Sequence, residues 1–579
     1  MKTLALYYQL FTLCVLTLIT ASCNTDNDII PGNKPTIEFD SPDGVYTVKV
    51  GHDLRIDPIV GHGDGAAFLW TSNGETVSTS RALVMNFPRL GSYYVMLTVT
   101  TPAGSTSAEA RVDVVETTPP IIDLALPTDG VYLLPGQEYL FEPRFQHDDV
   151  DGFRAVWNVN GTDVAEGKTY TFRRATVGDY QVAIHASNED GETTETFTVH
   201  VVESLPRSLS FPAPSVMQTS TTRYTFPNRP VILTPDAVNI ASDAAYSWKV
   251  NGKNVDETGS SFKFTPTAAG TYTVTVSADG VTATVDVVCV DATEQSRMRP
   301  ATASSSAYIN KVWEYVPAPG QFIGDTSTEI DMPDGVNTLQ DALRWAELRL
   351  SKRQFVSLGA CCGYIIAGFD HSVSADLTIW SNAFNTSNEP GVVWVMQDVN
   401  GNGRPDDEWY QLKGSDYSNP LTIHSYIVTY YKPAGAGMDV EWTDNQGQRG
   451  VIDYLRSHHG QDSYYPAWIE QTTLTLRGTR LPNNGVYNSV TGQWASNPLG
   501  WGYADNCGSD QLTPGTTGGG AGQCVNLKIS NAVMANGEPI ALEYVDFVMV
   551  QSGLMQQLGQ LGESSTEVCA IADFSLVNN

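Results

Sequence analysis

One pattern occurs three times in the first half of this 579-residue chain, and it constrains the fold more than any other feature. Each copy has a tryptophan four residues before the glycine of a turn, in FLWTSNGETV, AVWNVNGTDV and YSWKVNGKNV. A second glycine follows 21 or 22 residues after each tryptophan and opens a run of alternating residues. Trp70, Trp157 and Trp248 lie 87 and 91 residues apart. Near-constant spacing of this kind indicates three tandem copies of one structural unit.

The alternating runs predict the kind of unit. Tyr272 to Val276, for example, alternates apolar and polar residues as a half-buried strand does. The tryptophan of each copy would then pack across the core between two sheets, as in an immunoglobulin-like sandwich. The pattern resembles PKD-type bacterial immunoglobulin-like domains, and we interpret the three copies as a stalk. The predicted domains are residues 37–116, 117–203 and 204–291.

The character of the sequence changes after these repeats. We expect a polar linker over 292–306 and one larger β domain over 307–579, which holds nine of the twelve tryptophans. Thr338 and Asp341 resemble a capping box at the start of a single helix. Many strands, one helix and glycine-rich connections favour a jelly-roll-like domain, so the expected fold class is all-β. Runs typical of strands lie at 363–370, 391–398, 425–431 and 543–550.

The first 23 residues indicate where the protein goes. Lys2 precedes an apolar segment too short to span a bilayer, and Thr-Ala-Ser-Cys then ends at Cys23. This resembles a bacterial lipobox, which implies a signal peptide over 1–22 and lipidation of Cys23. The acidic stretch within 23–36 resembles the export signal of Bacteroidetes surface lipoproteins. We therefore expect a protein held to the outer membrane by its lipid anchor only and facing the cell exterior.

Charge and motifs narrow the function classes. The chain has 33 Lys and Arg against 64 Asp and Glu, a formal net charge of −31, which argues against nucleic acid as a partner. The sequence has no nucleophile elbow, no His-Glu-x-x-His and no phosphate loop. We expect a binding protein rather than an enzyme.

The stretch DVNGNGRPDDEW at 398–409 has the spacing of a calcium loop. Oxygen-bearing side chains alternate in such a loop, and a glycine at the sixth position, here Gly403, permits the sharp turn. The twelfth position is Trp409, so Asp407 or Glu408 must close the shell, and we assign Glu408. Such turns also form without metal, but a structural Ca²⁺ is the favoured interpretation. The predicted ligands are Asp398, Asn400, Asn402, the carbonyl of Arg404, Asp406 and Glu408.

Two cysteines flank a glycine-rich stretch late in the chain. An exported protein matures where disulfides can form. A bridge between Cys507 and Cys524 would remove loop entropy of about 3 kcal/mol from the unfolded chain. We predict this disulfide, with two free thiols as the alternative.

Five longer motifs between residues 312 and 579 carry a further resemblance. They are VWEYVPAPGQFI, VSLGACCGYIIAGFDHSV, SNEPGVVWVMQDVNGNGRPDDEWYQLKGS, VTYYKPAGAGMDVEWTDNQGQRGVIDYL and GWGYADN. They resemble the blocks of PKD-containing cell-surface lipoproteins of Bacteroidetes, one branch of which is the BtuH-type cobalamin-binding lipoproteins. The resemblance implies capture of vitamin B12 (cobalamin) or a related corrinoid for a TonB-dependent outer-membrane transporter. The alternative is a surface glycan-binding protein, because jelly rolls with exposed aromatics and a calcium commonly bind sugars.

A corrinoid is broad, flat, mostly neutral and rimmed with amides, so its binder needs aromatic faces and polar rim groups. The stretches HHGQDSYYPAW at 458–468 and GWGYADN at 500–506 offer that mixture on expected loops. His458 or His459 could ligate cobalt, although a solvated histidine is the simpler interpretation. The same aromatic residues could instead fill the core. The predicted contact residues are Tyr464, Tyr465, Trp468, Trp501 and Tyr503, with Asp505 and Asn506 as rim partners.

Overall fold

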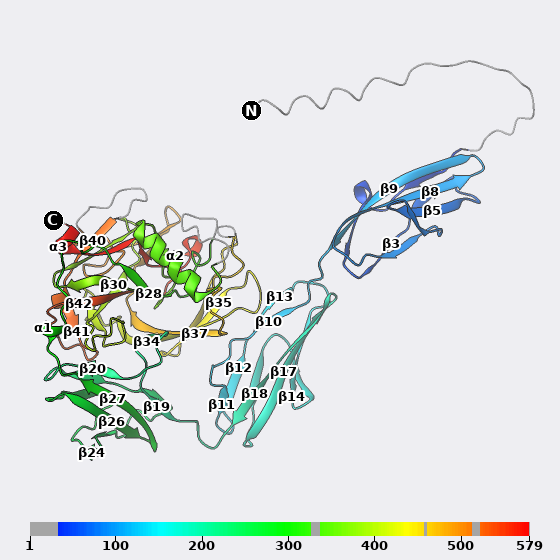
Figure 1. Cartoon of the computed structure of the whole chain (residues 1–579). Coiled ribbons are helices and arrows are strands. Elements are labelled where there is room, and N and C mark those ends of the chain that lie inside the picture. Colours follow the sequence, from blue (N-terminus) through cyan, green and yellow to red (C-terminus); the bar gives the residue numbers. More distant parts are fainter. Residues whose placement is uncertain (1–32, 326–335, 457–459, 512–521, 578–579) are drawn as a thin grey trace, which may run out of the picture. The chain divides into compact units, whose positions relative to one another are not determined.

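The computed structural model describes residues 33–325, 336–456, 460–511 and 522–577 (Figure 1). The chain divides into two compact units, Met1–Thr118 and Pro119–Asn579. The fold is all-β, as predicted, with repeated immunoglobulin-like sandwiches over 34–288 and a further β domain.

The three repeats share one topology. Each has a five-stranded sheet and two two-stranded sheets, and the strand order is the same in all three. One edge strand of each five-stranded sheet runs parallel to the last strand of its repeat, whereas the other neighbours are antiparallel. The first repeat comprises β1 (Thr36–Glu38), η1 (Pro42–Gly44), β2 (Val45–Lys49), β3 (Asp53–Ile56), β4 (Ile59–Gly61), β5 (Ala67–Ser72), β6 (Glu75–Ser78), β7 (Leu83–Asn86), β8 (Gly91–Thr101) and β9 (Gly104–Val115).

The second and third repeats follow the same order of elements. The second comprises β10 (Ile121–Asp123), β11 (Val131–Leu133), β12 (Glu138–Phe141), β13 (Arg144–Gln146), β14 (Arg154–Val159), β15 (Thr162–Glu166), β16 (Tyr170–Arg173), β17 (Gly178–Asn188) and β18 (Gly191–Val201). The third comprises β19 (Ser208–Ser210), β20 (Arg223–Thr225), β21 (Val231–Leu233), β22 (Asp236–Val238), β23 (Ser247–Val250), β24 (Lys253–Asn254), β25 (Phe262–Phe264), β26 (Gly270–Ala278) and β27 (Val281–Cys289).

The repeat tryptophans lie inside the three sandwiches. Trp70, Trp157 and Trp248 are 0%, 0% and 1% exposed, and each belongs to the core cluster of its own repeat. Each indole N–H donates to a backbone carbonyl ten or eleven residues further along, at 2.8–3.1 Å. A buried indole is stable when its one polar group is bonded in this way. The predicted burial of the three tryptophans is confirmed.

The C-terminal domain has two large sheets around one core. A six-stranded sheet has the order β28-β30-β42-β32-β33-β41, and a four-stranded sheet has the order β36-β35-β34-β37. Buried residues of both sheets, such as Ile365 and Tyr430, belong to one cluster, and the Tyr430 hydroxyl donates to the carbonyl of Cys361 at 2.9 Å. These strands are β28 (Lys311–Val316), β30 (Tyr364–Val373), β32 (Gly391–Met396), β33 (Tyr410–Leu412), β34 (Ile423–Tyr431), β35 (Val440–Asp444), β36 (Arg449–Ile452), β37 (Thr473–Arg480), β41 (Ala532–Val533) and β42 (Val545–Ser552).

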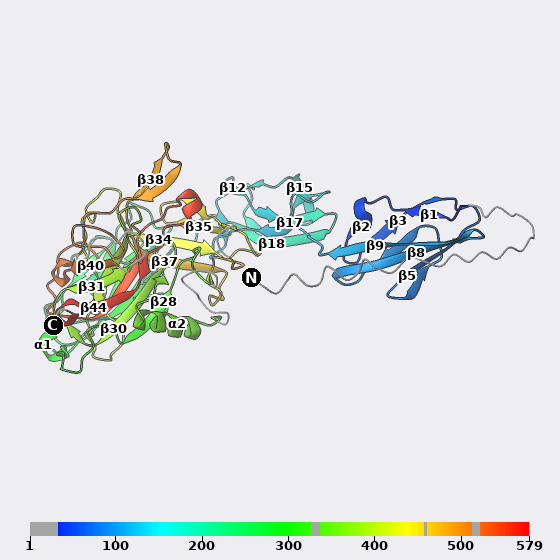
Figure 2. The same cartoon turned by 90° about the horizontal axis from the view of Figure 1, so that it is seen from above.

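The predicted helix is α2 (Leu339–Ser351). Its N-cap Thr338 accepts a hydrogen bond from the backbone N–H of Asp341, and Trp345 packs against Tyr315 with ring centroids 5.9 Å apart. The β38–β39 hairpin stands out from the rest of the domain (Figure 2). The remaining elements are α1 (Glu294–Arg297), β29 (Val356–Ser357), β31 (Leu377–Ser381), β38 (Gly485–Asn488), β39 (Gln493–Ser496), β40 (Gly522–Leu527), η2 (Ile529–Asn531), η3 (Gly559–Leu561), β43 (Glu567–Val568), β44 (Ala570–Asp573) and α3 (Phe574–Val577).

Candidate functional site

The aromatic residues predicted from 458–468 are core residues. Tyr464, Tyr465 and Trp468 are all buried in the main cluster of the C-terminal domain. The Tyr464 hydroxyl accepts from the backbone N–H of Leu455 at 3.0 Å, and Trp468 packs beside Tyr315. The interpretation of these three side chains as a ligand surface is therefore wrong, because the loop that carries them folds back and its large apolar area is removed from water. His458 and His459 lie outside the described residues.

The second predicted stretch, 500–506, is also mostly interior. Tyr503 is buried and its hydroxyl accepts from the backbone N–H of Asp416 at 2.9 Å. Asn506 is buried and its side chain bonds both backbone groups of Leu499 at 2.8 and 3.0 Å. Asp505 is buried among other carboxylates. Only Trp501 is exposed, at 38%, so the seven predicted contact residues do not form one surface and that prediction is wrong.

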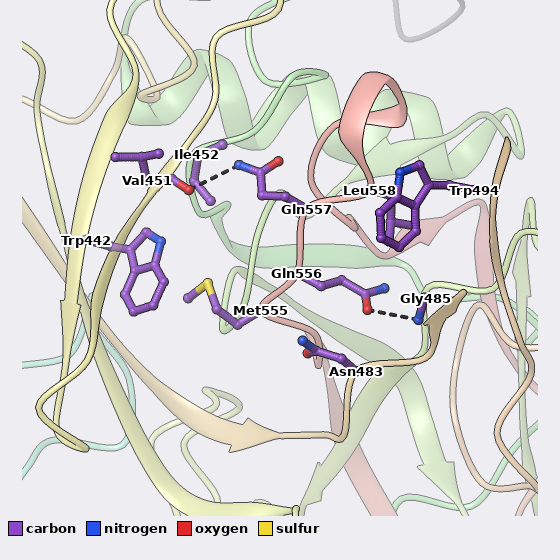
Figure 3. Close-up of a pocket in the computed structure, with 10 residues that line it drawn as sticks. All are labelled: Trp442, Val451, Ile452, Asn483, Gly485, Trp494, Met555, Gln556, Gln557 and Leu558. Atoms are coloured by element: carbon purple, nitrogen blue, oxygen red, sulfur yellow. Dashed lines mark hydrogen bonds between the residues drawn. The ribbon is translucent and has the colours of Figure 1, made fainter. Parts of the chain in front are cut away.

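A different part of the domain has the required chemistry. An open pocket of about 400 Å³ lies between β35, β36, the β38–β39 hairpin and the segment 555–558 (Figure 3). Trp442 and Trp494 stand on opposite sides of it in Figure 3, with Met555 between them. Its volume is within the range of small-molecule sites. The lining residues are Trp442, Val451, Ile452, Asn483, Gly485, Trp494, Met555, Gln556, Gln557 and Leu558.

The walls of the pocket depend on glycines that make room for large side chains. Gly450 lies opposite Trp442 in the β35–β36 pairing, and a Cβ there would come within 2.6 Å of the indole. A Cβ on Gly559 would come within 2.9 Å of Trp494 Nε1. A Cβ on Gly485 would likewise clash with the side chain of Leu558. The side chains of Trp442, Trp494 and Leu558 therefore pack directly against the backbone of these glycines, and this close packing fixes their positions.

Amide groups supply the polar part of the pocket. Gln557 Nε2 donates to the carbonyl of Val451 at 3.1 Å, while its buried Oε1 has no hydrogen-bond partner among the described residues. Asn483 is exposed at the rim. None of the ten lining residues is charged, although the chain carries a net charge of −31. The pocket is suited to a neutral ligand with both flat apolar and amide-bonding surfaces.

The side chain of Gln556 anchors the hairpin beside the pocket. Its Oε1 accepts from the backbone N–H groups of Asn484 and Gly485, both at 3.1 Å. Its Nε2 donates to Asn484 Oδ1 at 2.8 Å and to the Ser564 hydroxyl at 2.7 Å. The tip of the hairpin is exposed, with Val490 at 93%. Gln556 therefore holds the base of an element whose outer part faces solvent.

The lining residues of this pocket were not predicted from the sequence. Its lining comes from four segments spread over more than one hundred residues, and none of them is distinctive alone. One local feature pointed to the pocket. Trp442 pairs with Gly450 across a short hairpin, and because glycine has no side chain, the indole packs directly on the backbone of the neighbouring strand.

The predicted calcium loop wraps around the carboxylate of Asp398. Its two oxygens accept from the backbone N–H groups of Asn402 and Gly403 at 3.0 and 2.9 Å. The side-chain amides of Asn400 and Asn402 both donate to Asp406, at 2.8 and 2.9 Å. The backbone N–H of Arg404 donates to Asn402 Oδ1 at 2.8 Å. Five of the six predicted ligand positions therefore lie on one loop, and a cation would require the two amides to turn their oxygens inward.

Glu408, the sixth predicted ligand, points elsewhere. Its carboxylate forms an ion pair with Arg223 Nε at 2.7 Å, so the assignment of Glu408 to the shell is wrong. Asp407, the other residue that the sequence offered for this position, is 1% exposed, and its Oδ1 has no hydrogen-bond partner among the described residues. Burial, followed by the negative charge of Asp398, raises the pKa of Asp407 well above its usual range. A buried carboxylate with a free oxygen fits a cation ligand.

Two further predictions concern cysteines. Cys507 is a free thiol whose sulfur accepts from Gln511 Nε2 at 3.4 Å, so the predicted Cys507–Cys524 disulfide is wrong. The backbone N–H of Cys507 donates to Asn388 Oδ1 at 2.7 Å. Cys23 lies outside the described residues.

Comparison with known proteins supports the assignment of the first two repeats. The family model of a PKD-like domain matches residues 34–101 and 119–188. No curated protein is similar enough to this chain to count as a match. Tandem PKD-like and immunoglobulin-like domains point to a surface or adhesion-type protein. Among the described residues, no helix has both the length and the apolar character needed to cross a membrane.

Solved structures with related domains align only loosely. The titin I-band fragment I67-I69 is 12% identical over 44% of this chain and 98% of that chain, with a TM-score of 0.19. Fibronectin(III)-like modules of Clostridium thermocellum CbhA are 16% identical over 29% of this chain and 94% of theirs, with a TM-score of 0.19. Immunoglobulin domains 1–5 of Sidekick-1 are 16% identical over 44% and 58%, with a TM-score of 0.20.

Proposed function

We propose that this protein is an outer-membrane surface lipoprotein that binds cobalamin or a related corrinoid in the pocket between Trp442 and Trp494. In this proposal it presents the ligand to a TonB-dependent transporter. The observation that carries the proposal is the neutral pocket with two indoles and a set of amides. The resemblance of the motifs between residues 312 and 579 supports the choice of ligand.

The chemistry of the pocket supports a ligand of this kind. The flat faces of a corrinoid need aromatic and thioether contacts, which Trp442, Trp494 and Met555 offer. The amides on its rim need neutral donors and acceptors, which Asn483 and Gln557 Oε1, an atom with no partner in the described part of the chain, offer. A corrinoid is larger than a cavity of about 400 Å³, so the pocket would hold one side of it and leave the other side accessible to the transporter.

The other parts of the chain have supporting roles in this proposal. Cys23 would carry the lipid, and the second and third PKD-like repeats would brace the binding domain, to which ion pairs such as Arg144–Asp439 and Arg223–Glu408 join them, rather than act as a free stalk. A calcium ion on Asp398, Asn400, Asn402, Asp406 and Asp407 would stiffen a loop at the end of β32 without taking part in chemistry. Replacing Cys23 by Ala should release the protein from the membrane fraction, and retention there would contradict the lipid anchor.

Calorimetric titration of the mature protein with cyanocobalamin and with a glycan panel tests the ligand. We expect cobalamin binding that is weakened at least tenfold, about 1.4 kcal/mol, by Trp494→Ala. Trp501→Ala is the matched control, because Trp501 is exposed but lies outside the pocket. It should leave the affinity unchanged, and both variants should melt close to the wild type.

Each other outcome has a definite meaning. Cobalamin binding that survives Trp494→Ala would place the site elsewhere on the domain. Binding to a glycan and not to cobalamin would establish the alternative function, a surface glycan-binding lipoprotein, which the same aromatic and amide lining would serve.

A further inference from the structure

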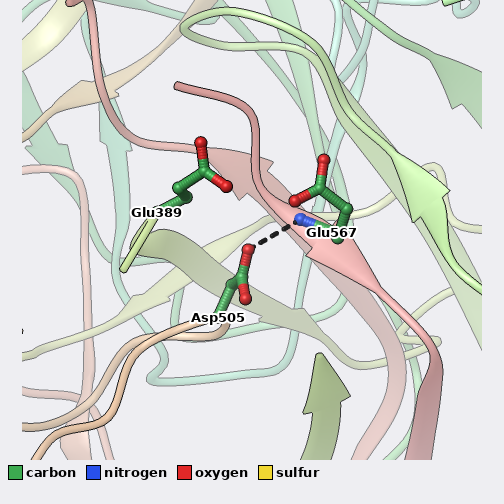
Figure 4. Close-up of side chains that lie close together, drawn as sticks. All are labelled: Glu389, Asp505 and Glu567. Carbon is green, nitrogen blue, oxygen red and sulfur yellow. Dashed lines mark hydrogen bonds between the residues drawn. The ribbon is translucent and has the colours of Figure 1, made fainter. Parts of the chain in front are cut away.

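Three carboxylates from distant parts of the C-terminal domain converge inside it. Glu389 precedes β32, Asp505 lies in the loop after Trp501, and Glu567 is on β43. One oxygen from each lies within 4.8 Å of the other two (Figure 4). Asp505 and Glu567 are buried and Glu389 is partly buried. Together they form what we call the carboxylate triad.

The neutral groups around the triad satisfy its hydrogen-bonding oxygens only in part. Asp505 Oδ2 accepts from the backbone N–H of Glu567 at 2.9 Å, and Glu389 Oε1 accepts from that of Ser565 at 3.0 Å. By distance and angle, Asp505 Oδ1 and both carboxylate oxygens of Glu567 have no hydrogen-bond partner among the described residues, and the nearby hydroxyls of Ser357 and Ser565 offset the burial of Glu567 only in part. Glu567 is 1% exposed, and Figure 4 shows its carboxylate on the side of the cluster that faces Glu389. Buried oxygens without partners are rare in folded proteins, so these three need an explanation.

The charges of the triad disfavour each other. Burial, followed by the charge of Asp505, raises the pKa of Glu389 to about 8. Burial also raises the pKa values of Asp505 and Glu567, and in each case a second carboxylate of the triad is the next cause. Three like groups this close are stable only if protons or a cation compensate their charge.

The geometry favours a cation. Oxygens that bind one calcium ion at about 2.3–2.6 Å lie within about 5 Å of one another, which is the spacing within the triad. A ligand set made only of carboxylate oxygens suits a hard divalent ion, whereas zinc and copper prefer nitrogen and sulfur. We propose that Glu389, Asp505 and Glu567 form a buried binding site for a hard divalent cation of the calcium class.

The site would have a structural role, with no part in ligand contact and no residue in common with the loop at 398–408. Its three segments already touch: the N–H of Glu389 donates to the carbonyl of Asp505 at 3.0 Å, and the Thr566 hydroxyl donates to the carbonyl of Glu389 at 2.8 Å. A cation at the triad would tie the side chains of the same three segments together. The segment 555–558, which lines the pocket, precedes Glu567 in the chain, with η3 between them, so a cation at the triad would also fix the end of the chain segment that leaves the pocket.

Metal content of the mature protein tests the proposal. The protein is stripped with chelator, loaded with Ca²⁺, Mg²⁺ or Mn²⁺ in separate samples, dialysed and measured by mass spectrometry. The loop at 398–408 is first neutralised by Asp398→Asn with Asp407→Asn, so that any remaining ion belongs to the triad. In this background we expect one ion per chain, and its loss when Glu389→Gln and Glu567→Gln are added. These substitutions keep the shape of the side chains and remove their charge.

Thermal unfolding gives a second readout. In the loop-neutralised background, Ca²⁺ should raise the melting temperature of the C-terminal domain, and the two Glu→Gln changes should abolish that rise. If the double change prevents folding, Glu389→Gln alone should weaken the ion at least tenfold. No ion in the loop-neutralised protein, or metal content unchanged by the Glu→Gln substitutions, would overturn the proposal and leave shared protons as the way the triad is neutralised.

Discussion

Replacing Gln556 by Ala tests the link between the interior of the C-terminal domain and its pocket. The side chain makes four hydrogen bonds, at 3.1, 3.1, 2.8 and 2.7 Å, to Asn484, Gly485 and Ser564. A typical bond contributes about 0.5–1.5 kcal/mol, and a buried donor left without a partner costs about 1–3 kcal/mol. The loss of all four should therefore cost about 2–6 kcal/mol.

The assay is thermal unfolding of the mature protein combined with amide hydrogen exchange. A cost of this size should lower the melting temperature of the C-terminal domain by about 5–15 °C. Exchange should speed up first in β38 and β39, because Gln556 holds the base of that hairpin. Gln556→Glu is the matched control: it keeps the acceptor for the two backbone N–H groups and loses the two donors, so about half of the effect should remain.

The same variant should weaken ligand binding, because Trp494 is carried by the hairpin. Unchanged melting and unchanged exchange in the hairpin of Gln556→Ala would refute the reasoning, since four bonds would then contribute nothing. A lower melting temperature with unchanged hairpin exchange would move the role of Gln556 from the hairpin to the Ser564 side.

Three further predictions concern other parts of the molecule. Trp157→Ala should lower the free energy of unfolding of the second repeat by about 3–5 kcal/mol, measured by denaturant unfolding, and leave amide hydrogen exchange in the first repeat, around Trp70, unchanged. Equal effects in the two repeats would contradict separate cores. Chelation should lower the melting temperature of the C-terminal domain, and the decrease should be smaller in Asp407→Asn, because that variant already lacks a ligand in the loop at 398–408. If chelation lowers the melting temperature of Asp407→Asn as much as that of the wild type, the loop is not a cation site. Burial raises the pKa of Asp123 to about 6, and burial followed by the charge of Asp123 raises that of Glu441 to about 7. Because both folded pKa values lie above the unfolded ones, this contribution to stability is present below about pH 4 and is lost as the pH rises through about 6 to 7. Glu441→Gln should therefore flatten the fall in melting temperature between about pH 5 and 8. An unchanged slope would contradict this prediction.

The sequence by itself determined the repeats. The spacing of the tryptophans, the alternation of the strands and the Asn-Gly turns are all local features, and each acts within one hairpin or one strand pair. Asn73 and Gly74, for example, have φ values of 49° and 81°, which this type of turn needs and which these two residue types adopt readily. The turn at 398–408 could be predicted for the same reason, because the oxygen-bearing side chains that gather around Asp398 and Asp406 are close together in the chain.

Only the tertiary structure decided which side chains face a ligand and which face the core. Tyr464 and Trp494 are both aromatic residues in glycine-rich, polar surroundings, yet one is buried under two sheets and the other lines an open pocket. The same holds for carboxylates: Asp407 and Glu408 are neighbours, and packing turns one into the loop and the other toward Arg223. The burial of such a residue depends on segments 62 or more residues away, as in the triad of Glu389, Asp505 and Glu567, and no local periodicity encodes that distance.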